Sequence, residues 1–209
     1  MRLSVKTLLI ALLLLPISAL AALDDEVRAL QTEWAEIKYR RPAAEQEKAF
    51  AALTKNADAV RGRYAGRAEP QIWYGIIAAS YAGARGGLGA LSLAKDAKKA
   101  LEQALELDPK ALDGSAYTSL GSLYYQVPGW PIGFGNDDKA RELLEKAIAL
   151  NPEGIDPNYF LGDFLYRQGD TVGARRALQK ALRAPARPER AVADEGRRKE
   201  IESLLAAMR

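Results

Sequence analysis

The sequence predicts an all-α solenoid of antiparallel helix pairs, and three observations support this fold class. Alanine supplies 38 of the 209 residues, and with Leu, Glu, Lys and Arg it makes a composition typical of helices. Apolar residues recur at spacings of three and four, which places them on one face of each helix. The chain also repeats itself at a shift of 43 residues and then at a shift of 34, which indicates stacked supersecondary units.

The first predicted element, residues 1–21, is a secretory signal peptide. It has a basic start, an apolar stretch over 8–15 and a small-x-small cleavage site at 19–21, so the mature chain would begin at Ala22. A retained membrane anchor is the alternative, but a span needs about 20 apolar residues and Pro16 interrupts this stretch. We therefore expect an exported, periplasmic protein with no integral membrane span after cleavage.

Residues 22–68 follow as a helical pair that forms a degenerate first repeat or cap of the single domain 22–209. Its apolar residues keep helical spacing, and Pro42 suits the first turn of the second helix. These apolar residues are Val27, Leu30, Trp34 and Ile37 on the first helix and Phe50, Leu53, Ala57, Val60 and Tyr64 on the second.

Three recognisable repeats come next, at residues 70–109, 113–152 and 156–185. The first two align without a gap and share Tyr, Leu, Ala and Pro at matching positions. The third departs from the pattern, since Asn158 replaces the first aromatic residue and Pro185 comes one residue early. It still repeats the spacing of small and large residues, so we count it as a unit.

The second repeat resembles the tetratricopeptide repeat (TPR) most fully. In that pattern an aromatic, Leu-Gly and Tyr lie on the first helix, small-large-small residues lie on the second, and Pro ends the unit. The small residues let the two helices approach closely, and Pro cannot continue the hydrogen-bond ladder. Here the pattern reads Tyr117-x2-Leu120-Gly121-x2-Tyr124, then Ala140-x3-Leu144-x2-Ala147, then Pro152.

A last helix over residues 189–208 is predicted to cap the stack. Ile201 and Leu205 would pack inward, while the basic run from Arg197 to Lys199 would lie on the solvated back of the helix. A stack of helix pairs needs such a polar-backed end, because its last apolar face would otherwise be exposed.

Repeats one and two are seven residues longer than an ordinary 34-residue unit, and the extra residues fall between the paired helices. The first insertion, residues 83–89, is glycine-rich and predicts a flexible turn, not a phosphate loop, because no Gly-Lys-Ser/Thr follows. The second, residues 127–135, carries Trp130, Ile132 and Phe134 among prolines and glycines that forbid a regular helix. These side chains either pack back as local core or wall a ligand pocket or partner surface.

A ligand or partner is expected on the concave face, which the first helix of each pair lines. Tyrosines there offer rigid area and a hydroxyl, although exposed polar residues without a partner would give the same pattern. In the first repeat this face holds only Gly75, Ala79 and Ala82, so the groove is expected to be open at that end. The candidate binding residues are Thr118, Ser122, Tyr125, Gln126, Trp130, Phe134, Tyr159, Asp163, Tyr166 and Arg167.

Composition excludes several kinds of chemistry. The chain has no cysteine and no histidine, which excludes cysteine nucleophiles, Ser-His-Asp triads, disulfides and ordinary structural zinc sites. Without the two basic residues of the signal it carries 28 basic and 27 acidic residues, which is not the electrostatic footprint of a nucleic-acid binder. We find no catalytic constellation, and we predict neither enzyme activity nor a metal or cofactor.

Beyond the generic repeat, three stretches resemble the T-component family associated with tripartite (TRAP) transporters. They read LGSLYYQVPGWPIGFG at 120–135, GIDPNYFLGDFL at 154–165 and ADEGRRKEI at 193–201, and the resemblance covers about residues 70–205. It implies a bacterial periplasmic, all-helical protein that associates with a solute-binding subunit and accepts a hydrophobic small ligand. The chain differs from that family in lacking a lipid-modified cysteine and in having few repeats, which argues against a tethered pore assembly.

Two functions are therefore expected of a non-catalytic, exported scaffold. The first is an accessory of a periplasmic solute transport system, with a ligand in the tyrosine groove beside Trp130 and Phe134. The second is a general periplasmic adaptor that holds a peptide or partner protein in its concave groove, with the loop merely structural.

Overall fold

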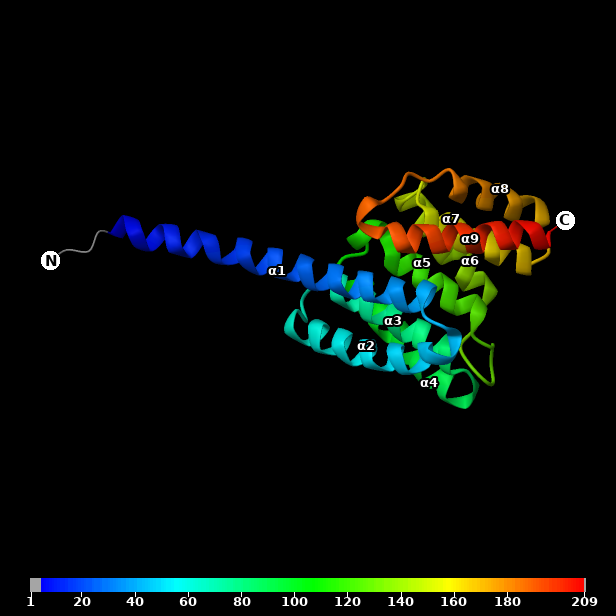
Figure 1. Ribbon diagram of the computed structural model, residues 1–209, viewed down its shortest axis with the longest axis horizontal. Helices are drawn as coiled ribbons and strands as arrows, with labels where there is room; N and C mark the ends of the chain where they lie inside the picture. The colour runs from blue at the N-terminus through cyan, green and yellow to red at the C-terminus, as the bar shows by residue number, and fades with distance from the viewer. Residues whose placement is uncertain (1–4, 209) are drawn as a thin grey trace.

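The fold is an all-α, TPR-like helix-pair solenoid, as the sequence predicts. The computed structural model describes residues 5–208, which form α-helices and one short 3-10 helix and contain no β-strand (Figure 1). The elements are α1 (Val5–Arg40), α2 (Ala43–Arg63), α3 (Ala68–Arg85), α4 (Gly87–Leu107), α5 (Ala111–Gln126), α6 (Asp137–Leu150), α7 (Ile155–Arg167), α8 (Thr171–Leu182), η1 (Pro188–Arg190) and α9 (Ala191–Ala207).

Helix α1 begins outside the body of the molecule and ends inside it. Its first part projects away from the bundle, and from Leu23 onward its apolar residues are buried against the other helices (Figure 1). Residues 1–4 of the predicted export signal lie outside the described part of the chain, and the signal stays a prediction. Among the described residues, no helix is long and apolar enough to cross a membrane.

The three repeat pairs, α3 with α4, α5 with α6 and α7 with α8, use the same close contact. A glycine on the first helix of each pair lies against a leucine on the second, and each of these leucines is fully buried. A Cβ atom on any of the three glycines would come within 3 Å of the leucine side chain, so only glycine permits this helix separation. The contacts are Gly75 on Leu101, Gly121 on Leu144 and Gly162 on Leu178.

The expectation of a flexible glycine-rich turn over residues 83–89 is wrong. The extra residues of the first repeat lengthen both helices instead, since α3 continues to Arg85 and α4 begins at Gly87. The turn between them is tight, with φ of 64° at Gly86 and 61° at Gly87. Glycine adopts this left-handed conformation at little steric cost, so two glycines suffice to reverse the chain.

The extra residues of the second repeat do form a loop, between α5 and α6. Its ends are fixed, because the Asn136 N–H donates to the Tyr124 carbonyl at 2.8 Å and Gly129 bridges to Gly135. The Asn136 side chain then accepts from the Lys139 N–H at 2.8 Å and caps α6.

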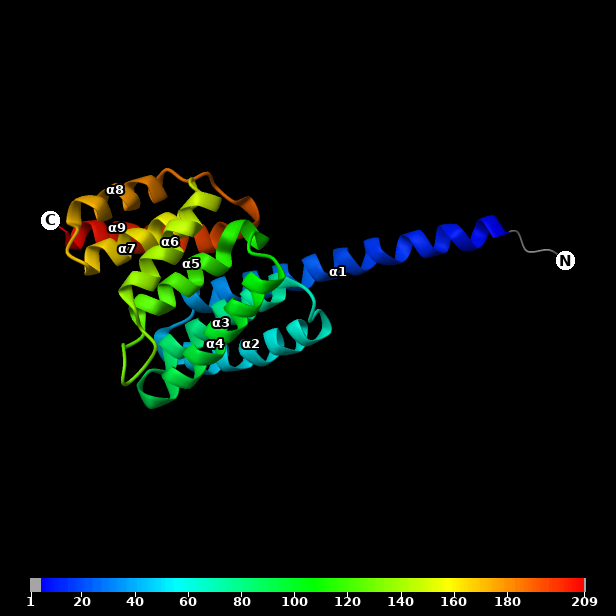
Figure 2. The ribbon, with the colours of Figure 1, turned by 180° about the vertical axis from the view of Figure 1, so that it is seen from behind.

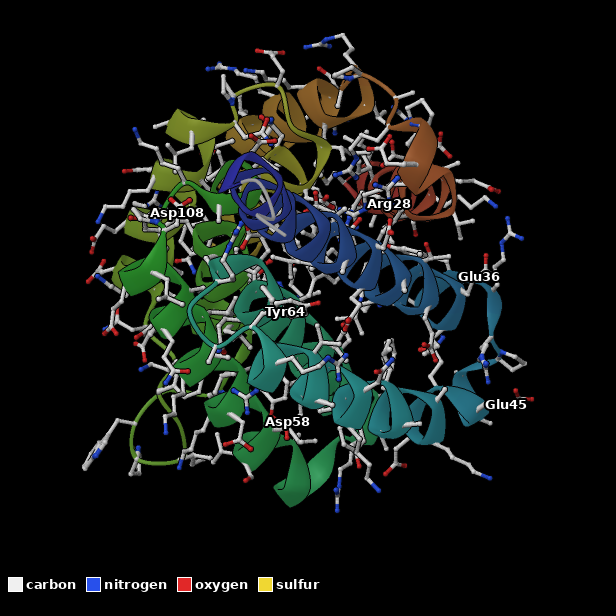
Figure 3. All side chains as sticks on the ribbon, turned by 90° about the vertical axis from the view of Figure 1, so that its left-hand side faces the viewer. Arg28, Glu36, Glu45, Asp58, Tyr64 and Asp108 are labelled. Carbon is white, nitrogen blue, oxygen red and sulfur yellow. The ribbon has the colours of Figure 1, made fainter. Side chains whose placement is uncertain are left out.

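The stack closes on itself, which the sequence did not predict. Helix α9 packs against α7 and α8 and also against α1, and η1 contacts α1 as well, so the last elements meet the first (Figure 2). Seen from the side of the projecting helix, α1 crosses between α2 and α9 (Figure 3). The solenoid therefore makes one closed turn, and its concave face becomes the wall of an internal space.

Candidate functional site

A central cavity of about 960 Å³ occupies the inside of this closed turn. Residues of α1, α2, α3, α5 and α7 line it, and η1 and α9 supply the remaining wall. Binding sites for small molecules have volumes of about 300–1,000 Å³, so the cavity is of the size that holds one small ligand.

One wall of the cavity is aromatic and apolar. Trp34 of α1 and Trp73 of α3 meet edge to face with ring centroids 6.0 Å apart, and Phe50 and Ile76 lie beside them in the lining. The Trp34 indole N–H donates to the Ser80 hydroxyl at 2.8 Å, which fixes the ring in this wall. The three aromatic side chains are buried and make a rigid backing, and Ile76 is the half-buried apolar side chain that this part of the lining offers to a ligand.

Next to the aromatic wall lies a network of buried ion pairs that joins α7, α9 and the segment that enters η1. Asp156 of α7 accepts from Arg187 Nη1 at 3.0 Å and from Arg197 Nε at 2.9 Å. Arg187 also pairs with Asp194, and Arg197 donates to Glu200 at 2.7 Å. The side chains of Arg197 and Asp194 are each 8% exposed, so these charges are removed from water and depend on one another.

The electrostatics of the network follow from burial opposed by opposite charge. Burial alone would raise the pKa of Asp156, but Arg197 and Arg187 outweigh it and hold the pKa at about 2. Burial would likewise lower the pKa of Arg197, but Tyr39, Asp156 and Glu200 outweigh it and raise the pKa. Both groups are therefore charged at neutral pH.

Tyr39 and Lys38 carry the network across to α1. The Tyr39 hydroxyl donates to Glu200 at 3.2 Å, and Lys38 lies 3.6 Å from the same carboxylate. Burial, together with Glu200, raises the pKa of Tyr39, so its hydroxyl keeps its proton. The expectation that Arg197 lies on the solvated back of the last helix is wrong, because that side of α9 faces α1 and α7.

Six of the ten predicted binding residues line the cavity. They come from α5 and α7, the first helices of the second and third repeat pairs, and their role in binding stays a prediction. The six are Thr118, Ser122, Gln126, Tyr159, Asp163 and Arg167.

The other four predicted residues lie outside the cavity lining. Tyr125 packs against Phe164, and its hydroxyl donates to Asp163 at 2.8 Å, so this tyrosine supports the wall from behind. Burial, and then the Asp163 carboxylate, raises the pKa of Tyr125. The Tyr166 hydroxyl lies 3.5 Å from the Ala207 carbonyl at the end of α9. Of the three tyrosines predicted to line a groove, only Tyr159 lines the cavity, whereas Tyr125 and Tyr166 support the packing of the helices.

Trp130 and Phe134, the remaining two, belong to the loop between α5 and α6. Phe134 packs edge to face on Tyr124 with centroids 5.5 Å apart, as a local core residue. Trp130 is 90% exposed and Ile132 is 69% exposed, so these two do not pack back on the helices. The loop does not border the cavity, so a ligand in the cavity would not contact Trp130 or Phe134.

The first repeat contributes more to the cavity than the sequence indicated. Of the three residues predicted on this face, Ala79 lines the cavity, whereas Gly75, which faces Leu101 of α4, and Ala82 do not. The lining contributed by α3 also includes Trp73, Ile76 and Ser80. That end of the groove is walled by two tryptophans and is not open. Helical spacing alone does not tell which of two adjacent faces meets the partner helix.

The entry to α5 is strained where it borders the cavity. Leu112, Asp113 and Gly114 have φ values of 48°, 55° and 76°, and side-chain-bearing residues rarely adopt this left-handed region. Leu112 and Asp113 line the cavity. Such strain is found preferentially at functional sites.

Comparisons with known proteins agree with the fold. Residues 133–194, which span α6, α7, α8 and the start of α9, match the tetratricopeptide repeat family. The chain thus has a helix-pair fold of the TPR type, and its concave face lines a partly open cavity.

Two solved structures, titled "Crystal structure of MamA" and "Crystal structure of MamA protein", are similar to this chain at 21% and 20% identity. The first covers 81% of this chain and 94% of its own with a TM-score of 0.45, and the second covers 88% and 91% with a TM-score of 0.44. No curated protein matches the chain.

Proposed function

We propose that the protein is a non-catalytic binding scaffold that holds a small ligand in its central cavity. The closed turn of the solenoid is the observation that carries this proposal. Open solenoids bind peptides and proteins along a concave surface, whereas here α9 and η1 meet α1 across that surface. A space of about 960 Å³ with one aromatic wall accommodates a small molecule better than a folded partner.

The test is to fill the cavity. Ala79 lines it, and Ala79→Trp would place an indole ring in the ligand space. Small-molecule fractions from the host cell are added to the purified protein, and thermal unfolding is followed. We expect at least one fraction to raise the Tm of the wild type and not that of Ala79→Trp, because a ligand stabilises only the protein that binds it.

The matched control is Ala52→Trp, which adds the same ring to an exposed position on α2. It should respond to the fractions as the wild type does. If no fraction stabilises the wild type, or if Ala79→Trp responds equally, the cavity is not a ligand site.

The exposed loop favours a second role, the binding of a protein partner. Trp130 and Ile132 project from the loop on a face separate from the cavity. Aromatic side chains are enriched at the centres of protein interfaces, and an isolated tryptophan exposed to this degree is uncommon in a monomer. The resemblance to the T-component family supports a periplasmic solute-binding subunit as the partner, and the predicted export signal supports a periplasmic location.

Crosslinking affinity purification of the tagged protein from its own host, with mass spectrometry of the captured proteins, tests this role. Trp130→Ala should lose the partner while its stability stays within about 0.5 kcal/mol of the wild type, since the side chain is 90% exposed. Val172→Ala removes another exposed apolar side chain, 73% exposed on α8, and should keep the partner. Recovery of a solute-binding subunit and a permease supports a role as a transport accessory, whereas recovery of other envelope proteins supports a general adaptor. If the wild type and both variants capture the partner equally, the loop is not the binding site.

A further inference from the structure

Two buried hydrogen-bond donors in the cavity wall have no acceptor among the described residues. They are the Nε–H of Arg190 in η1 and the indole N–H of Trp73 in α3. The two side chains are neighbours, because the Arg190 guanidinium lies 5.0 Å from the centre of the Trp73 ring. Buried donors are nearly always paired, so two adjacent unpaired donors at a cavity indicate that an acceptor belongs there.

Five cationic side chains line the cavity, and among the described residues Arg190 is the one of them that has no ion pair. The other four, Lys38, Arg167, Arg187 and Arg197, each lie within 4.0 Å of a carboxylate. Burial lowers the pKa of Arg190; Asp156 opposes this, and Arg187 adds to it by repulsion. The Nε–H of Arg190 is therefore shielded from water, and no carboxylate lies within ion-pair distance of the guanidinium.

The acidic residues of the lining do not fill that role. Asp156, Asp163 and Glu200 are engaged by arginines of the cavity, and Glu153 pairs with Lys180. Asp113 and Glu189 also line the cavity but are exposed to solvent. The buried interior thus has paired charges throughout, plus one unpaired cation beside the aromatic wall.

We propose that the cavity binds a small organic anion, whose carboxylate or phosphate pairs with Arg190 and whose apolar body packs against Ile76 and Ala79 of α3. This inference rests on the proposed function and names the ligand class for that site. The geometry matches the two parts of such a ligand, since the guanidinium lies over the Trp73 ring and the following turns of the same helix bring Ile76 and Ala79 to the cavity. Arginine binds planar oxyanions through two parallel hydrogen bonds, which gives both affinity and orientation.

The experiment compares charged and neutral probes of the same shape. Indole-3-acetate, phenylacetate, octanoate and phenyl phosphate are titrated calorimetrically, each beside its neutral amide or alcohol. We expect at least one acid to bind the wild-type full chain and its neutral counterpart to bind roughly tenfold to a hundredfold more weakly, the range for one hydrogen-bonded charge pair.

Arg190→Gln should abolish that preference by weakening the acid and leaving the neutral probe unchanged. Arg183→Gln removes an exposed arginine at the end of α8 and should behave as the wild type. Comparing the three carboxylate probes with phenyl phosphate shows which of the two acidic groups the cavity binds. If acids and neutral probes bind alike, the anion inference fails and the cavity remains a ligand site; if no acid binds, the inference fails regardless of the fraction screen.

A second readout needs no ligand. In the free protein Arg190 is a partly buried charge that no carboxylate contacts, so replacing it by the shorter and neutral Gln should not lower the Tm. A residue that serves ligand binding at a cost in stability can be replaced without lowering the Tm. A marked loss of stability in Arg190→Gln, like that expected for Asp156→Asn, would show that Arg190 belongs to the structural network instead.

Discussion

At the residue scale, the glycines that bring paired helices together make the sharpest prediction. Gly75 and Gly83 lie on the same helix, α3, but a Cβ on Gly75 would lie 2.6 Å from Leu101 Cγ, whereas one on Gly83 would meet nothing within 4 Å. We expect Gly75→Ala to lower the free energy of unfolding by about 1–3 kcal/mol, because Leu101 is fully buried and has no room to move.

Gly83→Ala is the matched control, and its expected effect has the opposite sign. Replacing a helical glycine by alanine without a clash raises stability by about 0.5–1 kcal/mol, through the entropy of the unfolded chain. Urea unfolding followed by circular dichroism measures both variants. Equal stabilisation by the two substitutions would mean that α3 and α4 are not in close contact at Gly75.

A repeat pattern predicts the contacts that every unit shares, but not the contacts that are particular to one unit. Gly121 and Leu144 were assigned correctly from spacing, because every unit repeats that contact. Asn158 breaks the pattern, yet it is buried and donates to the Pro152 and Gly154 carbonyls at 2.8 Å, so a local hydrogen bond replaces the aromatic contact. Arg190 carried no signal in the sequence, since its importance comes from the absence of a counter-charge in three dimensions.

At the element scale, the attachment of η1 and α9 to α7 depends on Asp156. Two arginines converge on this carboxylate, and removing it would leave buried positive charge without compensation. We expect Asp156→Asn to lower the free energy of unfolding by roughly 2–4 kcal/mol at neutral pH. Asp25→Asn, on an exposed position of α1, serves as the control and should change it by less than about 0.5 kcal/mol.

The pH dependence of that difference follows from the pKa of Asp156. Its pKa is about 2 in the folded chain, below the ordinary value of 3.8, so folding is favoured by the ionised form. This stabilisation is complete above about pH 4 and is lost as the pH falls toward about 2. The wild type and Asp156→Asn should therefore converge in stability over this window, and a constant difference down to pH 2 would contradict the assigned ion pairs.

The elements also show where sequence reasoning stops. Nearly every helix was anticipated, because amphipathic spacing and proline mark local structure. The predicted role of α9 is wrong in part: its basic run is expected in solvent, since charge usually lies there, but Arg197 is buried and pairs with Asp156, 41 residues away on α7. Ion pairs between residues 40 or more positions apart leave no periodic signal in one sequence. The aromatic loop was open to two interpretations for the same reason.

At the scale of the whole molecule, closure converts a generic repeat stack into a container. An open solenoid keeps its ends apart and can fray from either end, because each unit contacts only its neighbours. Here the first and last helices are in contact, so anything that separates them also opens the cavity. Ligand binding and the stability of the two ends are therefore coupled. A ligand held between α1, α3 and Arg190 of η1 would stabilise the closed form over any opened one.

Closure can be tested with a covalent link, since the chain has no cysteine of its own. Lys38 Nζ and Glu200 Oε1 are 3.6 Å apart on α1 and α9. In the double variant Lys38→Cys/Glu200→Cys, a short bismaleimide should join the two residues in native buffer and fail to do so in denaturant. Closing so long a loop should raise the free energy of unfolding by about 3–5 kcal/mol relative to the same variant without the linker.

The pair Lys55→Cys/Glu200→Cys controls for random encounter, because Lys55 lies on α2, which does not pack against α9. Its yield of linked protein in native buffer should stay near that of the denatured chain. Equal yields from both pairs would mean that the ends are not held together, and the cavity would then be an open groove able to admit a peptide. If only the Lys38–Glu200 pair is linked, the ends are held together and the cavity admits small molecules but not a peptide. The class of ligand then follows from the closure of the fold.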